Sequence, residues 1–77
     1  MKVKVLLFGA EEKCVGRSSV DVEVADAPHA RDVLQALAER WPELKQARLA
    51  VNHAFASSDQ KISVKDELAL IGMVNGG

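Results

Sequence analysis

The chain has 77 residues, of which 48% are hydrophobic, and its ten basic side chains nearly balance eleven acidic ones. This length allows one domain with a modest core, and the charge balance excludes the basic surface that binds nucleic acid or an anionic membrane. No apolar run approaches the roughly 18 residues of a membrane span. A single cysteine, Cys14, excludes an internal disulfide and fits a reducing compartment. We therefore expect one soluble α+β domain over residues 1–77, located in the cytoplasm, with no nucleic-acid or membrane partner.

Two strands are predicted first along the chain. Residues 2–8 (KVKVLLF) and 19–24 (SVDVEV) both place an apolar side chain at every second position, as half-buried strands do. The positions expected to face the core are Val3, Val5, Leu7, Val20, Val22 and Val24. The polar stretch between the strands, with Gly9 and Gly16, predicts a long loop that joins them as a hairpin. The alternation and the acidic residues after it also argue against a signal peptide.

A helix is predicted next. Asp26 is expected to be its N-cap, and Pro28 is expected to lie in its first turn. The apolar positions that recur at helical spacing are Ala30, Val33, Leu34, Leu37 and Trp41. The helix should end at Trp41, because Pro42 disfavours the α conformation in the residue before it. Its apolar stripe must bury against the predicted sheet.

Three further segments are predicted to be strands: residues 48–52 (RLAVN), residues 61–64 (KISV) and residues 67–73 after the polar turn at Lys65 and Asp66. The element order is then β-β-α-β-(β)-β. One helix and four to five strands form a compact domain as a mixed sheet with the helix across one face. We expect the first and last strands to lie side by side in the middle. This arrangement is the β-grasp, or ubiquitin-like, fold.

The same alternation predicts an apolar patch on the face that the helix does not cover. If Leu68 and Leu70 face the core, Ile71 faces away, and Phe8 faces away at the end of the first strand. Phe55 has no evident place in the core and is expected to join them. Single exposed hydrophobic residues are common, but contiguous exposed apolar area marks a protein-binding surface. We favour the second interpretation.

The candidates for catalysis or metal binding are weak. Cys14 has no evident activating partner, so we expect an inert thiol, and His29 and His53 lack further ligands at metal-site spacing, so we expect no metal. The other candidates are the acid pairs Glu11–Glu12 and Asp66–Glu67 and the glycines Gly9 and Gly16. Paired acids must converge on a cleft to act, and the glycines do not fit a phosphate-binding motif. We therefore expect that the chain is not an enzyme on its own.

The most informative feature is the end of the chain, Gly76–Gly77. Glycine lacks a Cβ, so a Gly-Gly carboxylate can enter a channel that is too narrow for other residues. An enzyme that holds the terminus there can adenylate the carboxylate, and sulfur or nitrogen can then attack the acyl adenylate. We expect residues 74–77 to form a flexible tail that presents this reactive terminus.

Three segments carry a resemblance to a known family: VLLFGAEEKCVG near the start, LAVNHAF in the middle and VKDELALIGMVNGG at the end. The chain resembles the ubiquitin-like sulfur carriers that form the small subunit of molybdopterin synthase, over essentially all of its length. The final strand, the acidic turn before it and the double-glycine terminus are the most specific shared features.

The resemblance implies a mechanism. A ubiquitin-activating-type enzyme uses ATP to adenylate the carboxylate of Gly77, and sulfur from a persulfide donor converts it to a thiocarboxylate. The tail then enters the large subunit of a heterotetrameric molybdopterin synthase and donates sulfur to cyclic pyranopterin monophosphate. The chain itself binds no cofactor. The implied partner-binding residues are Phe8, Phe55, Ile71, Met73, Val74 and Asn75, and Gly76 accompanies Gly77 at the reactive terminus.

Three alternatives stay open. A thiamine-pathway sulfur carrier shares the fold, the tail and the activation chemistry, but such carriers usually lack the extended segment over residues 11–16. A ubiquitin-like modifier that becomes joined to lysines is the second alternative. The third is a β-grasp interaction module whose glycine tail is incidental.

Overall fold

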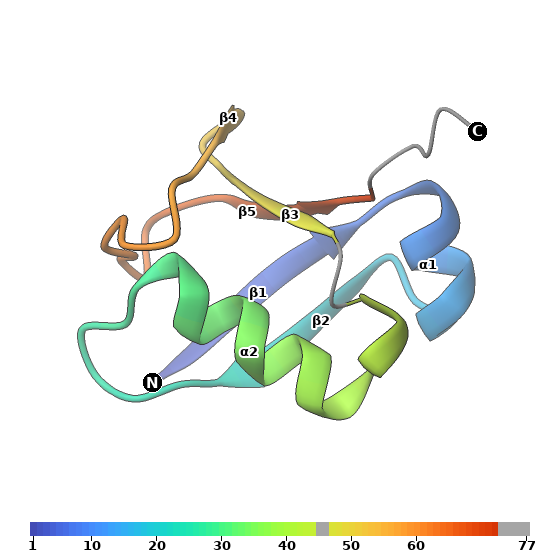
Figure 1. Ribbon diagram of the computed structural model, residues 1–77, viewed down its shortest axis with the longest axis horizontal. Helices are drawn as coiled ribbons and strands as arrows, with labels where there is room; N and C mark the ends of the chain where they lie inside the picture. The colour runs from blue at the N-terminus through green and yellow to red at the C-terminus, as the bar shows by residue number, and fades with distance from the viewer. Residues whose placement is uncertain (45–46, 73–77) are drawn as a thin grey trace.

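The computed structural model describes residues 1–44 and 47–72. The elements in chain order are β1 (Lys2–Leu7), α1 (Gly9–Val15), β2 (Ser19–Glu23), α2 (Ala30–Arg40), the 3-10 helix η1 (Pro42–Leu44), β3 (Arg48–Val51), β4 (Ala54–Phe55) and β5 (Leu68–Ile71). The described residues form a five-stranded mixed sheet in the order β2-β1-β5-β3-β4, and α2 crosses one face of it (Figure 1). The predicted α+β, β-grasp fold is confirmed.

The core lies between the sheet and α2, as the alternation predicted. Every second residue of β1 is buried, and β2 buries its two central valines. From α2, the residues Ala30, Val33 and Leu37 are buried, while Leu34 and Trp41 of the predicted stripe pack against the core and stay partly exposed. Full burial of a valine or leucine side chain, as at Val33 and Leu37, contributes about 1.5–3 kcal/mol.

The first and last strands lie side by side in the middle of the sheet, as predicted. β1 and β5 run parallel, with Val5 opposite Leu68 and Leu7 opposite Leu70. β3 pairs antiparallel with the other edge of β5, so β5 has a partner on both sides. Leu68 and Leu70 both face the core, with exposed fractions of 2% and 0%.

The prediction of a long loop after the first strand was wrong, because residues 9–15 form the helix α1. Ala10 and the charged residues after it have good helix propensity. Gly16 ends the helix in the left-handed conformation, with φ of 83°, and its N–H donates to the carbonyl of Glu12. Phe8 therefore lies at the N-cap of α1, one residue beyond β1, and Cys14 is exposed on the helix.

The predicted N-cap of α2 was also wrong. The N-cap is His29, whose backbone N–H donates to Oδ2 of Asp32 at 2.7 Å. The helix α2 begins later in the chain than predicted because the residues before it pair with a distant loop. The N–H of Ile62 donates to the carbonyl of Pro28 at 2.9 Å. Pro28 is buried there, before the helix begins.

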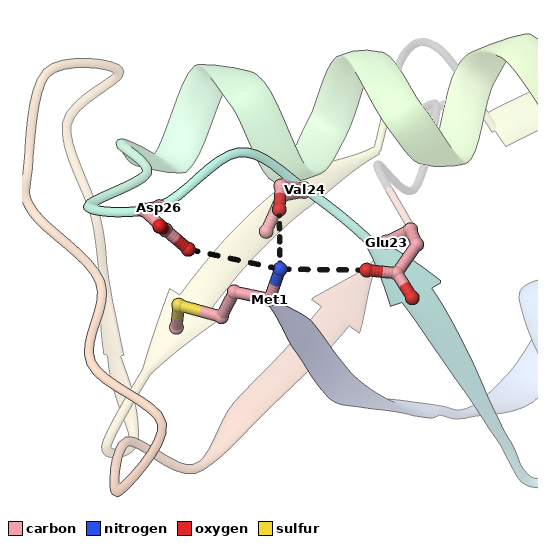
Figure 2. Close-up of polar contacts among 4 residues, drawn as sticks. All are labelled: Met1, Glu23, Val24 and Asp26. Atoms are coloured by element: carbon pink, nitrogen blue, oxygen red, sulfur yellow. Dashed lines mark hydrogen bonds and ion pairs between the residues drawn. The ribbon is translucent and has the colours of Figure 1, made fainter.

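The carboxylate of Asp26 instead lies 3.9 Å from the amino group of Met1. Figure 2 shows this amino group between Asp26, the carboxylate of Glu23 and the carbonyl of Val24, which accepts a hydrogen bond of 2.9 Å. These contacts join the beginning of the described chain to the connection between β2 and α2.

The strand predicted over residues 61–64 was wrong as well. Only Lys61 forms an isolated bridge, to His29, although Ile62 is buried in the core. The additional strand is β4, which follows a tight turn at Asn52 and His53 with φ values of 52° and 72°. Positive φ at both central residues is the signature of a type I′ hairpin turn. The turn folds Phe55 back against β3, opposite Ala50.

Candidate functional site

An apolar hollow of about 320 Å³ lies on the sheet. Its lining consists of Leu6, Phe8, Ala50, His53, Phe55, Glu67, Ala69 and Ile71. Leu6, Ala69 and Ile71 alternate along their strands with residues that face α2, so the hollow opens on the opposite face of the sheet. We refer to these eight residues as the hollow.

The structure brings together the three hydrophobic residues that the sequence predicted for the open face. Phe8 lies between β1 and α1, Phe55 comes from β4, and Ile71 is the last residue of β5. The exposed fractions of Phe8 and Phe55 are 52% and 58%, and Ile71 is half-buried. Their assembly in one place is what a contiguous protein-binding patch requires. Their role in binding a partner stays a prediction.

Small side chains form the part of the hollow that the sequence reading missed. Leu6 on β1 lies opposite Ala69 on β5, and Ala69 lies opposite Ala50 on β3. Two adjacent alanines lower the surface between the larger residues around them, which creates the depression. The signal was present in the alternation, because Ala69 shares its face with Ile71.

Polar side chains border the hollow near the β3–β4 turn. Nε2 of His53 lies 3.1 Å from Oε1 of Glu67. The side chain of Asn52 fixes the neighbouring turn: its Oδ1 accepts from the N–H of Glu67 at 2.9 Å, and its Nδ2 donates to Oδ1 of Asp66 at 3.0 Å. The predicted acid pair Asp66–Glu67 is therefore part of a turn rather than of a catalytic cleft.

Arg48 borders the hollow on another side. Its Cζ lies 4.7 Å from the centroid of the Phe55 ring, within the range of a cation–π contact. Arg48 is also directly opposite Ile71 in the pairing of β3 with β5. The backbone of Arg48 thus lies beside the last residue of β5, while its guanidinium lies over Phe55 of β4.

The other candidate residues lie in separate parts of the described structure. His29 lies beside Asp32, and His53 lies beside Glu67, so the two histidines have separate neighbours. In residues 1–44 and 47–72, no group of three or more His, Cys, Asp or Glu side chains is placed to hold a metal ion. Glu11 and Glu12 lie on α1. Within the same ranges, no helix is long and apolar enough to cross a membrane.

The predicted reactive terminus, Gly76 and Gly77, lies outside the described residues, as do Met73, Val74 and Asn75. Their roles stay predictions. The last described residue is Gly72, which is half-buried.

Comparison with known proteins supports the interpretation of the fold and shows the family. The model of the ThiS family matches residues 5–77. The chain is 32% identical to the molybdopterin synthase sulfur carrier subunit of Dictyostelium discoideum, over 96% of this chain and 94% of that protein. It is 26% identical to the molybdopterin synthase sulfur carrier subunit of Arabidopsis thaliana, over 100% of this chain and 84% of that protein.

Among solved structures, the crystal structure of SAMP1 from Haloferax volcanii is similar over 100% of both chains, with a TM-score of 0.80 and 25% identity. The predicted resemblance to ubiquitin-like sulfur carriers is confirmed by these matches. Since the family match extends over residues 5–77 and the Dictyostelium protein is 32% identical across nearly the whole chain, this chain belongs to the ThiS family.

Proposed function

We propose that this protein is the sulfur-carrier subunit of a molybdopterin synthase. The observation that carries the proposal is the combination of a ThiS-family chain with two relatives that are both molybdopterin synthase sulfur carrier subunits. The sequence adds the Gly76–Gly77 terminus, and the fold adds an apolar hollow whose wall includes the last residue of β5.

The proposed chemistry takes place at the carboxylate of Gly77. A ubiquitin-activating-type enzyme transfers AMP from ATP to this carboxylate and releases pyrophosphate. The terminal sulfur of a persulfide attacks the acyl carbon and displaces AMP, and a thiol then cleaves the sulfur–sulfur bond. The products are a thiocarboxylate on Gly77 and a disulfide on the donor side. The sulfur of the thiocarboxylate bonds to cyclic pyranopterin monophosphate, water then cleaves the bond between the acyl carbon and this sulfur, and Gly77 returns to a carboxylate.

The hollow is the proposed docking surface for the large subunit of the synthase. Phe8 and Phe55 expose about half of their surface in the free chain. Burial of apolar area contributes roughly 25 cal/mol per Å², and half-exposed aromatic side chains are frequent binding hot spots when a partner covers them. A partner that covers the hollow also contacts Ile71, and is thereby placed where the chain continues from β5 toward the terminus.

Intact-mass measurement tests the carrier chemistry. The protein is incubated with its adenylating enzyme, ATP and a persulfide donor. We expect a mass gain equal to the replacement of one oxygen by one sulfur. A variant that lacks Gly77 serves as the control and should show no gain. Absence of the gain in the intact protein, under conditions in which a known carrier is converted, contradicts the proposal.

Binding to the large subunit tests the docking surface. The Phe8→Asp variant should lose at least about 30-fold in affinity, as expected for a buried aromatic hot spot. Val64→Asp is the matched control, because Val64 is 68% exposed and is not part of the hollow. Both variants should keep the wild-type circular dichroism spectrum. Wild-type affinity in Phe8→Asp excludes the hollow as the docking surface.

A protein modifier is the second candidate, and the similarity to SAMP1 favours it. SAMP1 is small archaeal modifier protein 1 of Haloferax volcanii, and it matches this chain over its full length. The two functions share activation of the terminus and differ in the attacking atom. Adducts in which Gly77 is joined to lysine side chains, in place of a free thiocarboxylate, would support the modifier.

A thiamine-pathway sulfur carrier would give the same mass gain, so a different measurement separates it from the main proposal. The protein is isolated from its source cells and its bound partner is identified. A molybdopterin synthase large subunit supports the main proposal, and a thiazole synthase supports the thiamine pathway.

A further inference from the structure

Arg48 holds a positive charge at the border of the hollow. It is the first residue of β3, it is exposed, and its guanidinium lies over the ring of Phe55 with 4.7 Å between Cζ and the ring centroid. Its position opposite Ile71 places it next to the end of β5. The guanidinium is therefore adjacent to the Phe55 wall of the hollow, and the backbone of Arg48 is adjacent to Ile71, which forms another wall.

The charge of Arg48 is not balanced within the described part of the chain. Across residues 1–44 and 47–72, no carboxylate oxygen lies within 4.0 Å of its guanidinium nitrogens. The acid that borders the hollow, Glu67, has His53 at 3.1 Å instead. Among the described residues, Arg48 is therefore a cation beside the hollow without a carboxylate partner.

The contact with Phe55 orients this cation. The ring covers one face of the planar guanidinium, and the N–H donors around its edge stay available. Such a planar guanidinium can donate two parallel hydrogen bonds to one carboxylate. The geometry thus combines an apolar surface, which supplies affinity, with an oriented guanidinium, which favours a negatively charged partner group.

We propose that Arg48 is a specificity-determining residue that binds a carboxylate on the large subunit when the hollow is covered. The inference rests on the proposed function, because it takes the large subunit as the occupant of the hollow. It assigns to that subunit an acidic side chain facing the start of β3. A partner with a basic or apolar side chain at this position is disfavoured, because it leaves the guanidinium desolvated and unpaired.

The alternative role for Arg48 is to pack on Phe55 without forming an ion pair with the partner. Three substitutions separate these roles. Arg48→Gln removes the charge and keeps a polar side chain, Arg48→Glu reverses the charge, and Arg48→Lys keeps the charge while losing the planar fork. If Arg48 only packs on Phe55, affinity should depend on the length of the side chain. If Arg48 pairs with a carboxylate, affinity should depend on the sign of the charge and on ionic strength.

The experiment measures the association rate and affinity for the purified large subunit at several salt concentrations. At low salt we expect about 3- to 10-fold weaker binding for Arg48→Gln and a loss of more than about 10-fold for Arg48→Glu, mainly in the association rate. Arg48→Lys should bind with an affinity between those of wild type and Arg48→Gln, because it keeps the charge and loses the planar fork. These differences should shrink at about 1 M salt, where the Debye length is about 3 Å.

Arg31→Gln is the matched control, because it makes the same charge change on α2, which lies on the other face of the sheet. It should bind as the wild type does. If Arg48→Glu binds with wild-type or higher affinity while Phe55→Asp fails to bind, the carboxylate contact is overturned and the docking surface stands. If Phe55→Asp also binds normally, the docking surface itself is overturned. Thermal unfolding of each variant verifies that it is folded.

Discussion

The carboxylate of Glu11 on α1 lies against Gly72, so closely that a Cβ added to residue 72 would overlap it. Glu11 and Gly72 are far apart in the sequence, and α1 and the end of β5 bring them together. The lack of a side chain at residue 72 is what gives the carboxylate its place. This contact lies at the last described residue before the proposed reactive terminus.

The first prediction concerns this contact. Gly72→Ala should lower the free energy of unfolding by less than about 0.5 kcal/mol, because the added methyl group displaces only the carboxylate of Glu11, the end of a flexible side chain that can move away. In the double variant Gly72→Ala/Glu11→Ala the loss should largely disappear, and urea unfolding of all four proteins gives the coupling energy. Gly16→Ala is the control: its φ of 83° makes alanine strained there, and Glu11→Ala should not relieve that strain. A loss of more than about 1 kcal/mol in Gly72→Ala that Glu11→Ala does not relieve contradicts this account of the contact.

The second prediction separates two roles of Asn52. This residue has a φ of 52°, and its side chain makes two hydrogen bonds in the turn. Asn52→Ala loses the bonds and strains the backbone, so it should destabilise the fold by about 2 kcal/mol. Asn52→Gly keeps the conformation accessible and loses only the bonds, so about 1 kcal/mol is expected. Equal losses in urea unfolding would show that the left-handed conformation contributes no cost.

The third prediction is a pH dependence at the start of α2. The hydrogen bond from the backbone N–H of His29 lowers the pKa of Asp32 below its usual value. Stability from this interaction is therefore complete above the unfolded-state pKa, near 4, and is lost as pH falls through the lower pKa of the folded state. Asp32→Asn should be less stable than wild type at pH 7, and the difference should shrink at acidic pH. Glu39→Gln on the same helix is the control.

The fourth prediction tests the centre of the core. Leu70 is fully buried on β5, between β1 and β3. Leu70→Ala should lower the free energy of unfolding by about 2–5 kcal/mol, since it removes buried methyl groups and leaves a cavity. Val64→Ala, at a residue that is 68% exposed, should change it by less than about 0.5 kcal/mol. Chemical denaturation measures both, and a loss below about 1 kcal/mol for Leu70→Ala contradicts the placement of β5 in the centre.

The elements that the sequence predicted correctly have a periodic apolar pattern of their own. Val3, Val5 and Leu7 alternate because each buries on the same face of β1, and the stripe of α2 recurs for the equivalent reason. Local periodicity was also sufficient to place Ile71 on the open face. The placement of Phe8 near Ile71 follows from that alternation and from the pairing of β1 with β5, whereas Phe55 joins them through the turn at Asn52.

The elements that the sequence did not reveal depend on contacts or caps. α1 buries no residue, so it has no apolar stripe to detect, and its end is set by Gly16. β4 is only two residues long and exists because of the turn at Asn52. The start of α2 is fixed by pairing with the distant loop that contains Ile62. The sequence also does not show that Arg48 borders the hollow, because this position depends on the pairing of β3 with β5 and on the contact with Phe55.

The parallel pairing of β1 with β5 makes the hollow depend on residues from both ends of the described chain. One wall of the hollow comes from Phe8 and another from Ile71, which are separated by almost the whole described sequence. A nascent or truncated chain that stops before β5 lacks both the central strand and the wall that Ile71 forms. A partner that binds the hollow therefore selects molecules in which synthesis and folding have already reached the segment that leads to the terminus.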